Sequence, residues 1–327
     1  MNIIIDGNWH FHKTFSVFST YYKNRDMSEV LVDPEAQQVL LRKCLIDMCY
    51  AINKFPKDEI DNVVVTIDSS SWRYNFYANY KYSLTKVRDE YYKLFLQRLY
   101  DFSDFLKKKG IIVTQVEGCE GDDLLYIWSL YYGYIRNEKT VIITGDSDMR
   151  QLITDNVSIF CNNSKSLKMY CNENNEVYWN DILDTDVQVV RTDPFEILMY
   201  KVIIGDTSDN IPKIKRGFGE KAFQKFLNSI KPYSEPKDVD LITMAQWIAT
   251  RFADYIHEDY VKVLEGVLFN LQMVWLNVAV YNENNYINED GRGILEHMLD
   301  NVNNNKNNYN YKDEYSLEKL YGMLINK

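Results

Sequence analysis

Paired cysteines and long apolar runs are absent from this sequence. The five cysteines form no CxxC pair and are odd in number, which argues against a cysteine-based zinc site or a disulfide framework and favours free thiols in a reducing compartment. No run of 18 or more apolar residues occurs. The opening residues do not form a charged and then apolar leader, because Asp6 interrupts them. We therefore expect a cytoplasmic protein, in the host cytoplasm if the source is viral, with no membrane partner.

Positive charge is also in short supply. The chain has 37 Lys and Arg against 47 Asp and Glu, for a net charge of −10, which by itself argues against a nucleic-acid partner. The cations are nevertheless grouped in two basic segments, 72–93 and 213–225. The first interleaves its cations with aromatic residues, a mixture that suits a single nucleic-acid strand. Each segment taken alone is equally well explained as a solvated helix face.

Strand-like and helix-like patterns alternate in the first two thirds of the chain. Runs of β-branched residues bounded by turn residues predict buried strands at 2–6, 62–68, 109–118, 139–148 and 157–162. Between them, Asp33-Pro34 opens one helical pattern, and a second runs from Val87 to the basic residues before Gly110. This alternation predicts an α/β domain with a parallel sheet over residues 1–205, followed by a mostly helical domain over 206–327.

Seven carboxylates stand where the predicted strands end. Asp6, Asp68, Asp146 and Asp148 follow strands directly, whereas Glu120, Asp122 and Asp123 follow another strand and open a helix expected over 124–135. The carboxyl ends of parallel strands share one edge of a sheet, so these acids should converge. A site rich in carboxylates and poor in histidine suits Mg²⁺ or Mn²⁺ better than zinc. Any one of them alone would be explained as a turn former or a helix cap.

A second polar cluster lies at 203–223, which reads IIGDTSDNIPKIKRGFGEKAF. Asp206 and Asp209 precede a turn, and Gly217 and Gly219 flank a phenylalanine at the start of a basic helix. Two glycines at a helix N-terminus allow backbone N–H groups to approach a phosphate closely. The alternative is an ordinary glycine-rich turn between helices.

Taken together, these motifs resemble the 5′→3′ exonuclease/flap endonuclease family, and most of all its phage-type ribonuclease H/5′-nuclease members. The resemblance covers most of residues 1–225 and consists of IIIDGN, TIDSSSWR with YANYK, EGCEGDDLL, ITGDSDMRQL and GDTSDNIP with GFGEKAF. It implies a PIN-like parallel-sheet nuclease domain with a helical arch at about 72–93, and a helical C-terminal domain with a helix-hairpin-helix at about 206–225. Gly121 stands where the family usually has Ala, and Lys213 where it usually has Gly.

The resemblance also assigns roles to individual residues. The family's basic residues near the scissile phosphate fall on Arg73 and Lys81. Nucleic-acid contacts are expected at Lys86, Arg88, Lys215, Arg216, Gly217, Gly219 and Lys221. The family's metal ligands fall on Asp6, Asp68, Glu120, Asp122, Asp123, Asp146, Asp148, Asp206 and Asp209. Without these nine acids the net charge would be −1, so the acidity of the chain would be concentrated at the site.

The implied function is metal-dependent hydrolysis of phosphodiesters at 5′ ends or junctions of duplex DNA or RNA–DNA hybrid, for primer removal in replication. The implied cofactors are two Mg²⁺ per site, replaceable by Mn²⁺, with K⁺ at the hairpin. The expected partners are flap or nicked duplexes, with a sliding clamp or a single-strand-binding protein as candidate protein partners, and the chain is expected to be a monomer.

Three other functions remain open at this point. A haloacid-dehalogenase-like phosphatase would suit the N-terminal strand with its Asp, but it needs a second Asp where this chain has Asn8. A toxin-type ribonuclease would share the acidic pocket but lack the motif at 206–223. A non-catalytic DNA-binding protein would have no use for the acids.

Overall fold

The computed structural model describes residues 1–81, 90–163, 166–233, 236 and 240–276. Within them the chain forms two compact units. Unit 1 holds residues 1–70 and 90–192, and unit 2 holds 71–81 and 193–276. This division differs from the expected boundary at 205, because α8 (Pro194–Ile204) buries Leu198, Met199 and Val202 in the core of the helical unit. The first part of the expected arch likewise belongs to unit 2.

Unit 1 is built on a seven-stranded sheet with strand order β3-β2-β1-β4-β5-β6-β7. The strands are β1 (Asn2–Asp6), β2 (Asn62–Thr66), β3 (Ile112–Thr114), β4 (Thr140–Ile143), β5 (Val157–Asn163), β6 (Ser166–Cys171) and β7 (Val187–Arg191). The first five are parallel, β6 is antiparallel to β5, and β7 is parallel to β6. All five strands expected from the sequence are present, whereas β6 and β7 were not expected.

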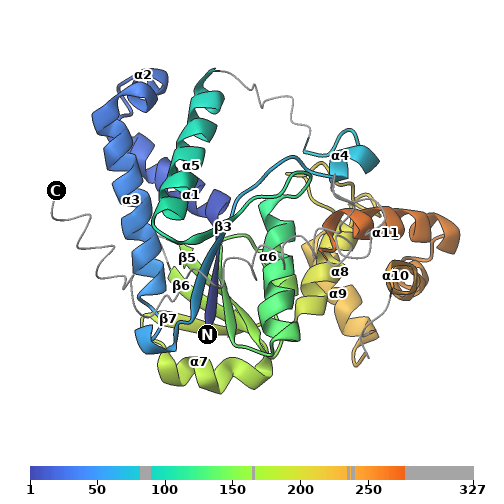
Figure 1. Ribbon diagram of the computed structural model, residues 1–327. Helices are drawn as coiled ribbons and strands as arrows, with labels where there is room; N and C mark the ends of the chain where they lie inside the picture. Colours follow the sequence, from blue (N-terminus) through green and yellow to red (C-terminus); the bar gives the residue numbers. More distant parts are fainter. Residues whose placement is uncertain (82–89, 164–165, 234–235, 237–239, 277–327) are drawn as a thin grey trace, which may run out of the picture. The chain divides into compact units, whose positions relative to one another are not determined.

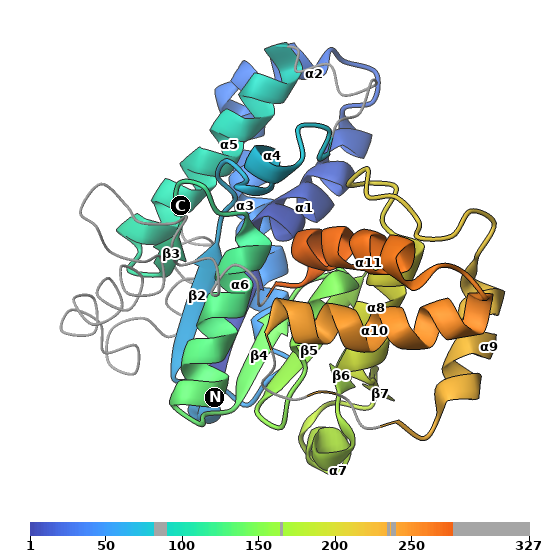
Figure 2. The same cartoon turned by 90° about the vertical axis from the view of Figure 1, so that its right-hand side faces the viewer.

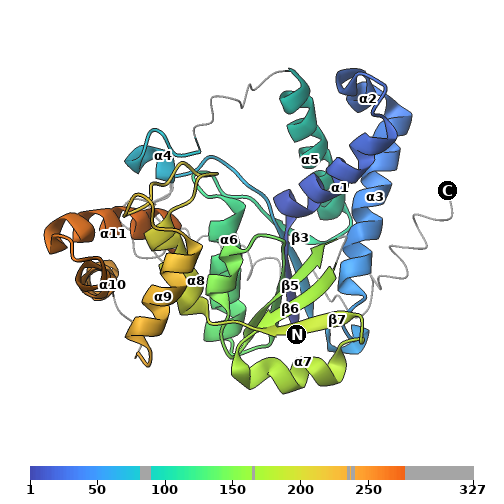
Figure 3. The same cartoon turned by 180° about the vertical axis from the view of Figure 1, so that it is seen from behind.

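Helices cover both faces of this sheet (Figures 1 and 3). On one side lie α1 (Gly7–Tyr21), α3 (Pro34–Ile52) and α5 (Glu90–Lys108), and on the other lies α6 (Gly121–Ser129). The remaining helical segments of unit 1 are α2 (Met27–Val32), η1 (Lys57–Glu59), the π-helix η2 (Leu130–Ile135), η3 (Asp148–Leu152), η4 (Glu173–Asn175) and α7 (Glu176–Ile182). Ile3, Val65 and Ile143 of the sheet share one buried core with Leu45 of α3 and Phe102 of α5.

Local sequence explains where these helices start and stop. Asp33 caps α3 by accepting from the N–H of Glu35, with Pro34 in the first helical position, as the sequence predicts. After α5 the chain turns at Gly110, whose φ of 84° suits glycine. The helix predicted over 124–135 begins earlier, at Gly121, and its last turns are a π-helix.

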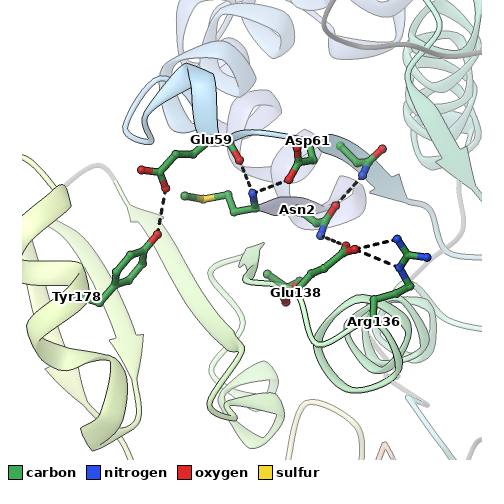
Figure 4. A network of polar contacts seen from close by, with 9 residues as sticks. Asn2, Glu59, Asp61, Arg136, Glu138 and Tyr178 are labelled. Atoms are coloured by element: carbon green, nitrogen blue, oxygen red, sulfur yellow. Dashed lines mark hydrogen bonds and ion pairs between the residues drawn. The ribbon is translucent and has the colours of Figure 1, made fainter.

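The amino end of the sheet is held by a polar network of mixed charge (Figure 4). The Asn2 side chain accepts from Asn62 at 2.7 Å and donates to Glu138 at 2.9 Å, and Glu138 pairs with Arg136 at 3.0 Å. The amino group of Met1 lies 3.0 Å from Asp61. At this edge Glu138 is thus paired with a cation and an amide, and Asp61 with the N-terminal amino group.

Unit 2 is helical. Its elements are α4 (Arg73–Phe76), α8, α9 (Glu220–Ile230), α10 (Leu241–Ile256) and α11 (Tyr260–Val274). Helices α10 and α11 pack side by side (Figure 2). The Asn270 amide of α11 donates to the carbonyls of Val202 and Pro212, both at 2.7 Å, and so joins α11 to α8 and the chain that follows it.

The predicted class, a mostly parallel α/β sheet followed by a helical region, is confirmed. The helix-hairpin-helix within the helical region stays a prediction. None of the helices in the described part of the chain is both long and apolar enough to cross a membrane.

Candidate active site

The strand register brings three of the predicted acids to one edge of the sheet. Asp6 ends β1 and is paired with Thr66 of β2, two residues before Asp68. On the other side of β1, Ile5 is paired with Ile143, three residues before Asp146. The charges of both Asp68 and Asp146 act on Asp6, so Asp6 lies within electrostatic reach of the other two carboxylates.

Asp6 lies at the centre of this edge and is 5% exposed. Its Oδ1 accepts from the N–H of Trp9 at 2.9 Å, which caps α1, and its Oδ2 accepts from the hydroxyl of Thr144 at 2.7 Å. Burial raises the pKa of Asp6 to about 7; the two hydrogen bonds oppose the shift, and the charges of Asp68 and Asp146 add to it.

Thr144 connects two of the acids. Besides donating to Asp6, its Oγ1 accepts from the N–H of Asp146 at 3.1 Å, and the N–H of Asp148 in turn donates to Asp146 Oδ1 at 2.8 Å. The Thr144 side chain is fully buried. Thr144 is not among the residues predicted above for the site; the available signal in the sequence is a threonine between a buried strand and GDSD.

The N-terminus of α6 holds the closely spaced acids of EGCEGDD. The N–H of Glu120 donates to Asp123 at 3.1 Å, and the Glu120 side chain accepts from the N–H of Asp123, a reciprocal capping box. Asp68 Oδ1 accepts from the N–H of Gly121 at 2.6 Å. A Cβ at Gly121 would lie 2.8 Å from that oxygen, so glycine at this position permits the close approach of Asp68. Three carboxylates are stabilised by the positive end of one helix.

Asn8 is a second residue that the sequence analysis did not place in the site. Its Oδ1 accepts from the N–H of Asp68 at 2.9 Å, which ties the chain after β2 to the first turn of α1. This is the position where a haloacid-dehalogenase-like phosphatase would need an acid. Asn8 instead uses its side-chain amide oxygen to hold the backbone of Asp68 in place.

The chemistry of this edge fits a hard divalent cation. Its side chains offer carboxylate oxygens, the ligands that Mg²⁺ and Mn²⁺ prefer. The hydroxyl of Thr66, which is fully buried and level with Asp6, finds no hydrogen-bond partner among the residues that the structure describes, so it could accommodate a further polar ligand beside the carboxylates. No group of three or more His, Cys, Asp or Glu within the described ranges is already arranged as a metal cage.

Comparison with known proteins agrees with this geometry. Residues 1–179 match the family model described as 5'-3' exonuclease, N-terminal resolvase-like domain. This chain belongs to the 5'-3' exonuclease family. The 5'-3' exonuclease of Mycoplasmopsis pulmonis is 26% identical over 250 residues, covering 75% of this chain and 73% of that protein. The DNA polymerase I of Chloroflexus aurantiacus is 27% identical over 231 residues, covering 68% of this chain and 23% of that protein.

Solved structures show the same fold. The bacteriophage T5 D15 flap endonuclease, crystallised with DNA and metal ions, has a TM-score of 0.56 at 17% identity and covers 93% of this chain and 98% of its own. The T5 D15 protein co-crystallised with metal ions has a TM-score of 0.53 at 18% identity and covers 86% and 91%.

The other residues that the family assigns to catalysis belong to unit 2. Asp206 Oδ2 accepts from the ammonium of Lys201 at 2.6 Å. Burial alone would raise the pKa of Asp206, but hydrogen bonds from Lys201 and Ser208 and the charge of Lys201 lower it to about 2. The carbonyl of Asp209 accepts from the N–H of Lys81 at 3.0 Å, and its carboxylate accepts from the Tyr80 hydroxyl at 3.3 Å. Unit 2 thus brings Lys81 and Asp209 together. Their approach to the acids of unit 1 stays a prediction.

Arg73 occupies a different environment from the one its expected role suggests. It is 2% exposed, its Nε donates to the carbonyl of Met273 at 2.8 Å, and its guanidinium lies 4.5 Å from the centre of the Trp72 ring. Trp72 and Tyr80 are buried as well, so part of the aromatic segment expected to stack on bases forms core. The catalytic role of Arg73 remains a prediction.

The expected hairpin presents its glycines outward. Phe218 is buried against Phe252, with ring centres 5.0 Å apart, while the Cβ positions of Gly217 and Gly219 have no neighbour within 4 Å in the described part of the chain. Gly217 has a φ of 79°, and Gly219 caps α9. Among the expected nucleic-acid contacts, Arg216 and Lys221 are exposed, and Lys215 pairs with Glu258. Lys86 and Arg88 lie outside the described residues.

Proposed function

We propose that this chain is a divalent-metal-dependent 5′ nuclease that hydrolyses phosphodiesters at 5′ ends or junctions of duplex DNA or RNA–DNA hybrid. The observation that carries the proposal is that Asp6, Asp68 and Asp146 follow adjacent strand ends, with the charges of Asp68 and Asp146 both acting on Asp6, in a chain of the 5'-3' exonuclease family. Crowded carboxylates are costly unless a cation relieves them. Relatives named DNA polymerase I support a role in replication, for which primer removal is the proposed task.

Each residue of the site has a proposed role in metal binding or catalysis. Asp6, Asp68 and Asp146 would hold the cation, and the remaining predicted ligands would complete its shell. Thr144, Trp9 and Asn8 orient these acids through hydrogen bonds. Bound Mg²⁺ or Mn²⁺ would lower the pKa of a coordinated water and stabilise negative charge on the leaving oxygen. Lys81, and Arg73 if it becomes exposed, would add positive charge beside the scissile phosphate.

Duplex binding would be independent of sequence. The outward glycines Gly217 and Gly219, with Lys215, Arg216 and Lys221 nearby in the sequence, suit contacts to a phosphate backbone. The two T5 relatives are described with metal ions, one of them also with DNA, which supports the same ligand classes here. K⁺ at the hairpin and two Mg²⁺ per site belong to the same proposal.

The test is a cleavage assay on labelled 5′-flap, nicked and RNA-primed duplexes, with MgCl₂ or with EDTA. We expect cleavage only with the metal. Asp146→Ala and Asp122→Ala should retain binding in a gel-shift assay but lose cleavage, whereas Asp104→Asn, which removes an exposed acid of α5, should cleave like the wild type. Cleavage by both active-site variants at the wild-type rate would refute the assigned site.

The same assay separates the alternative functions. Hydrolysis of small phosphomonoesters without activity on DNA would indicate a phosphatase. Binding of flap duplexes without any metal-dependent cleavage would indicate a non-catalytic DNA-binding protein.

A further inference from the structure

The acidic edge of the sheet continues into a basic one. The carboxylates occupy the ends of β2, β1 and β4, and the next strands along the edge are β5 and β6. The N–H of Thr144 donates to the carbonyl of Phe160 at 3.1 Å, which sets Cys161 beside Thr144, and Cys161 is paired with Lys168 of the antiparallel β6. Lys168 therefore lies level with the carboxylate edge, about 10 Å from β4 at the usual spacing of neighbouring strands.

Three cations gather at this part of the edge. The positive charges of Lys13, Arg150 and Lys168 all act on the Cys161 thiol, although they come from α1, η3 and β6. The ammonium of Lys13 donates to the carbonyl of Asn162 at 3.2 Å. Arg150 lies in the short helix that begins with Asp148, and its guanidinium lies 3.9 Å from the centre of the Tyr170 ring. Lys168 and Tyr170 are two residues apart on β6 and so share one face.

These cations have little negative charge to balance them. Within the described ranges, no carboxylate pairs with Arg150 or Lys168, and the nearest one to Lys13, Asp47, is 3.9 Å away. Arg150 is positioned by the Tyr170 ring, which leaves its guanidinium N–H groups available to an oxyanion. In a chain of net charge −10, three cations grouped with a single counter-anion among the described residues, Asp47, favour the binding of an anionic ligand.

We propose that Lys13, Arg150 and Lys168 form a subsite for backbone phosphates of the nucleic-acid strand whose scissile phosphate lies at the carboxylates. The proposal rests on the proposed nuclease function and extends it. In this arrangement the acids at the ends of β2, β1 and β4 would bind the scissile phosphate through the metal. The cations beside β5 and β6 would bind neighbouring phosphates of the same strand. This charge separation along one edge would fix the direction in which the strand crosses the sheet.

Salt dependence of binding tests the subsite without any cleavage. Full-length protein is titrated with a fluorescein-labelled 5′-flap duplex in EDTA at several salt concentrations. Each lost phosphate contact should reduce the slope of log K against log [salt] by about 1. Arg150→Gln/Lys168→Gln should therefore lower the slope by about 2. Lys108→Gln, at the exposed end of α5 and before the start of β3, should leave it unchanged.

Charge and packing are separated by a second variant. Arg150→Lys keeps the charge and should keep the wild-type slope, and all variants should show wild-type thermal unfolding. A neutral methylphosphonate can also replace one backbone phosphate at a time beside the cleavage point. At one or two positions this replacement should weaken the affinity of the wild type for the duplex. At the same positions it should leave the affinity of Arg150→Gln/Lys168→Gln unchanged.

An unchanged slope in the folded double variant would overturn the proposal. If inorganic phosphate alone also stabilises the wild type against heat, but not the double variant, the cluster is a site for free anions instead. Failure of the wild type to cleave any 5′-ended substrate would instead refute the proposed function, because the binding measurement is independent of cleavage.

Discussion

The hydroxyl of Thr144 donates to Asp6 across 2.7 Å while accepting from the N–H of Asp146. Removing it in Thr144→Val should take one of two hydrogen bonds from the Asp6 carboxylate and the acceptor from the Asp146 N–H. We expect this to weaken Mn²⁺ binding roughly 10- to 100-fold, the usual effect of losing an outer-shell contact. Isothermal titration with MnCl₂ measures this directly, and single-turnover cleavage should fall in parallel. Thr144→Ser keeps the hydroxyl and should behave like the wild type. Wild-type Mn²⁺ affinity in Thr144→Val would show that the hydrogen bonds do not position the acids.

Gly145 is required by the ring of Trp9. A Cβ at position 145 would lie 2.2 Å from the indole Nε1, so Gly145→Ala should destabilise unit 1 by about 1–3 kcal/mol, the usual cost of overpacking. Denaturant unfolding of Gly145→Ala, Trp9→Ala and the double variant measures the coupling. The alanine should cost much less when Trp9 is already gone. Additive losses would mean that the clash is relieved elsewhere.

His10 should make stability depend on pH. Burial lowers the pKa of His10 to about 4, opposed by its hydrogen bond to the carbonyl of Cys44 at 2.9 Å. The unfolded chain therefore binds a proton between pH 6.5 and 4 that the folded chain does not, so stability is full above pH 6.5 and falls towards pH 4 by up to about 3 kcal/mol. Thermal unfolding across this range should be flatter in His10→Gln. The exposed His257→Gln is the matched control.

Asp6 should have the opposite pH dependence in metal-free protein. Because its pKa is raised to about 7, the folded chain holds the proton more tightly than the unfolded chain, and stability should fall as pH rises from 4 to 7. In EDTA, Asp6→Asn should therefore melt at a higher temperature than the wild type at pH 8. Addition of MgCl₂ or MnCl₂ should raise the melting temperature of the wild type and not of Asp6→Asn. A metal response that survives in Asp6→Asn would remove Asp6 from the ligand set.

Much of the fold could be predicted from local sequence. Runs such as NVVVT are buried on both faces and give a strong strand signal. Asp33-Pro34 predicts a helix start, because the Asp side chain caps the helix and Pro suits its first position. Strands β6 and β7 were missed because SLKMYC and VQVVR mix polar with apolar residues and are partly exposed. Their place in the sheet depends on pairing with β5, which no local pattern records.

The acids of the site were identified because strand-end carboxylates form a repeated pattern. Residues that orient them were missed for a physical reason. Thr144 and Asn8 act through single hydrogen bonds to chain segments distant in sequence, and a threonine or asparagine after a strand is indistinguishable from a turn residue until those partners are known. Arg73 was assigned to the phosphate from the family resemblance, whereas the acceptor of its Nε, the carbonyl of Met273, is 200 residues away in the sequence.

That separation has a consequence for how the chain matures on the ribosome. Arg73 and Tyr80 are synthesised long before α11, yet Arg73 donates to the carbonyl of Met273, and Tyr80 is buried with Met273 and Ile211. Until α11 emerges, an aromatic segment and a cation are left without their native cover, a setting in which nascent proteins are prone to associate wrongly. A gene fragment that stops after residue 192 would make this exposure permanent, so the sheet unit should be produced with its C-terminal helices or with residues 71–81 replaced by a short polar linker.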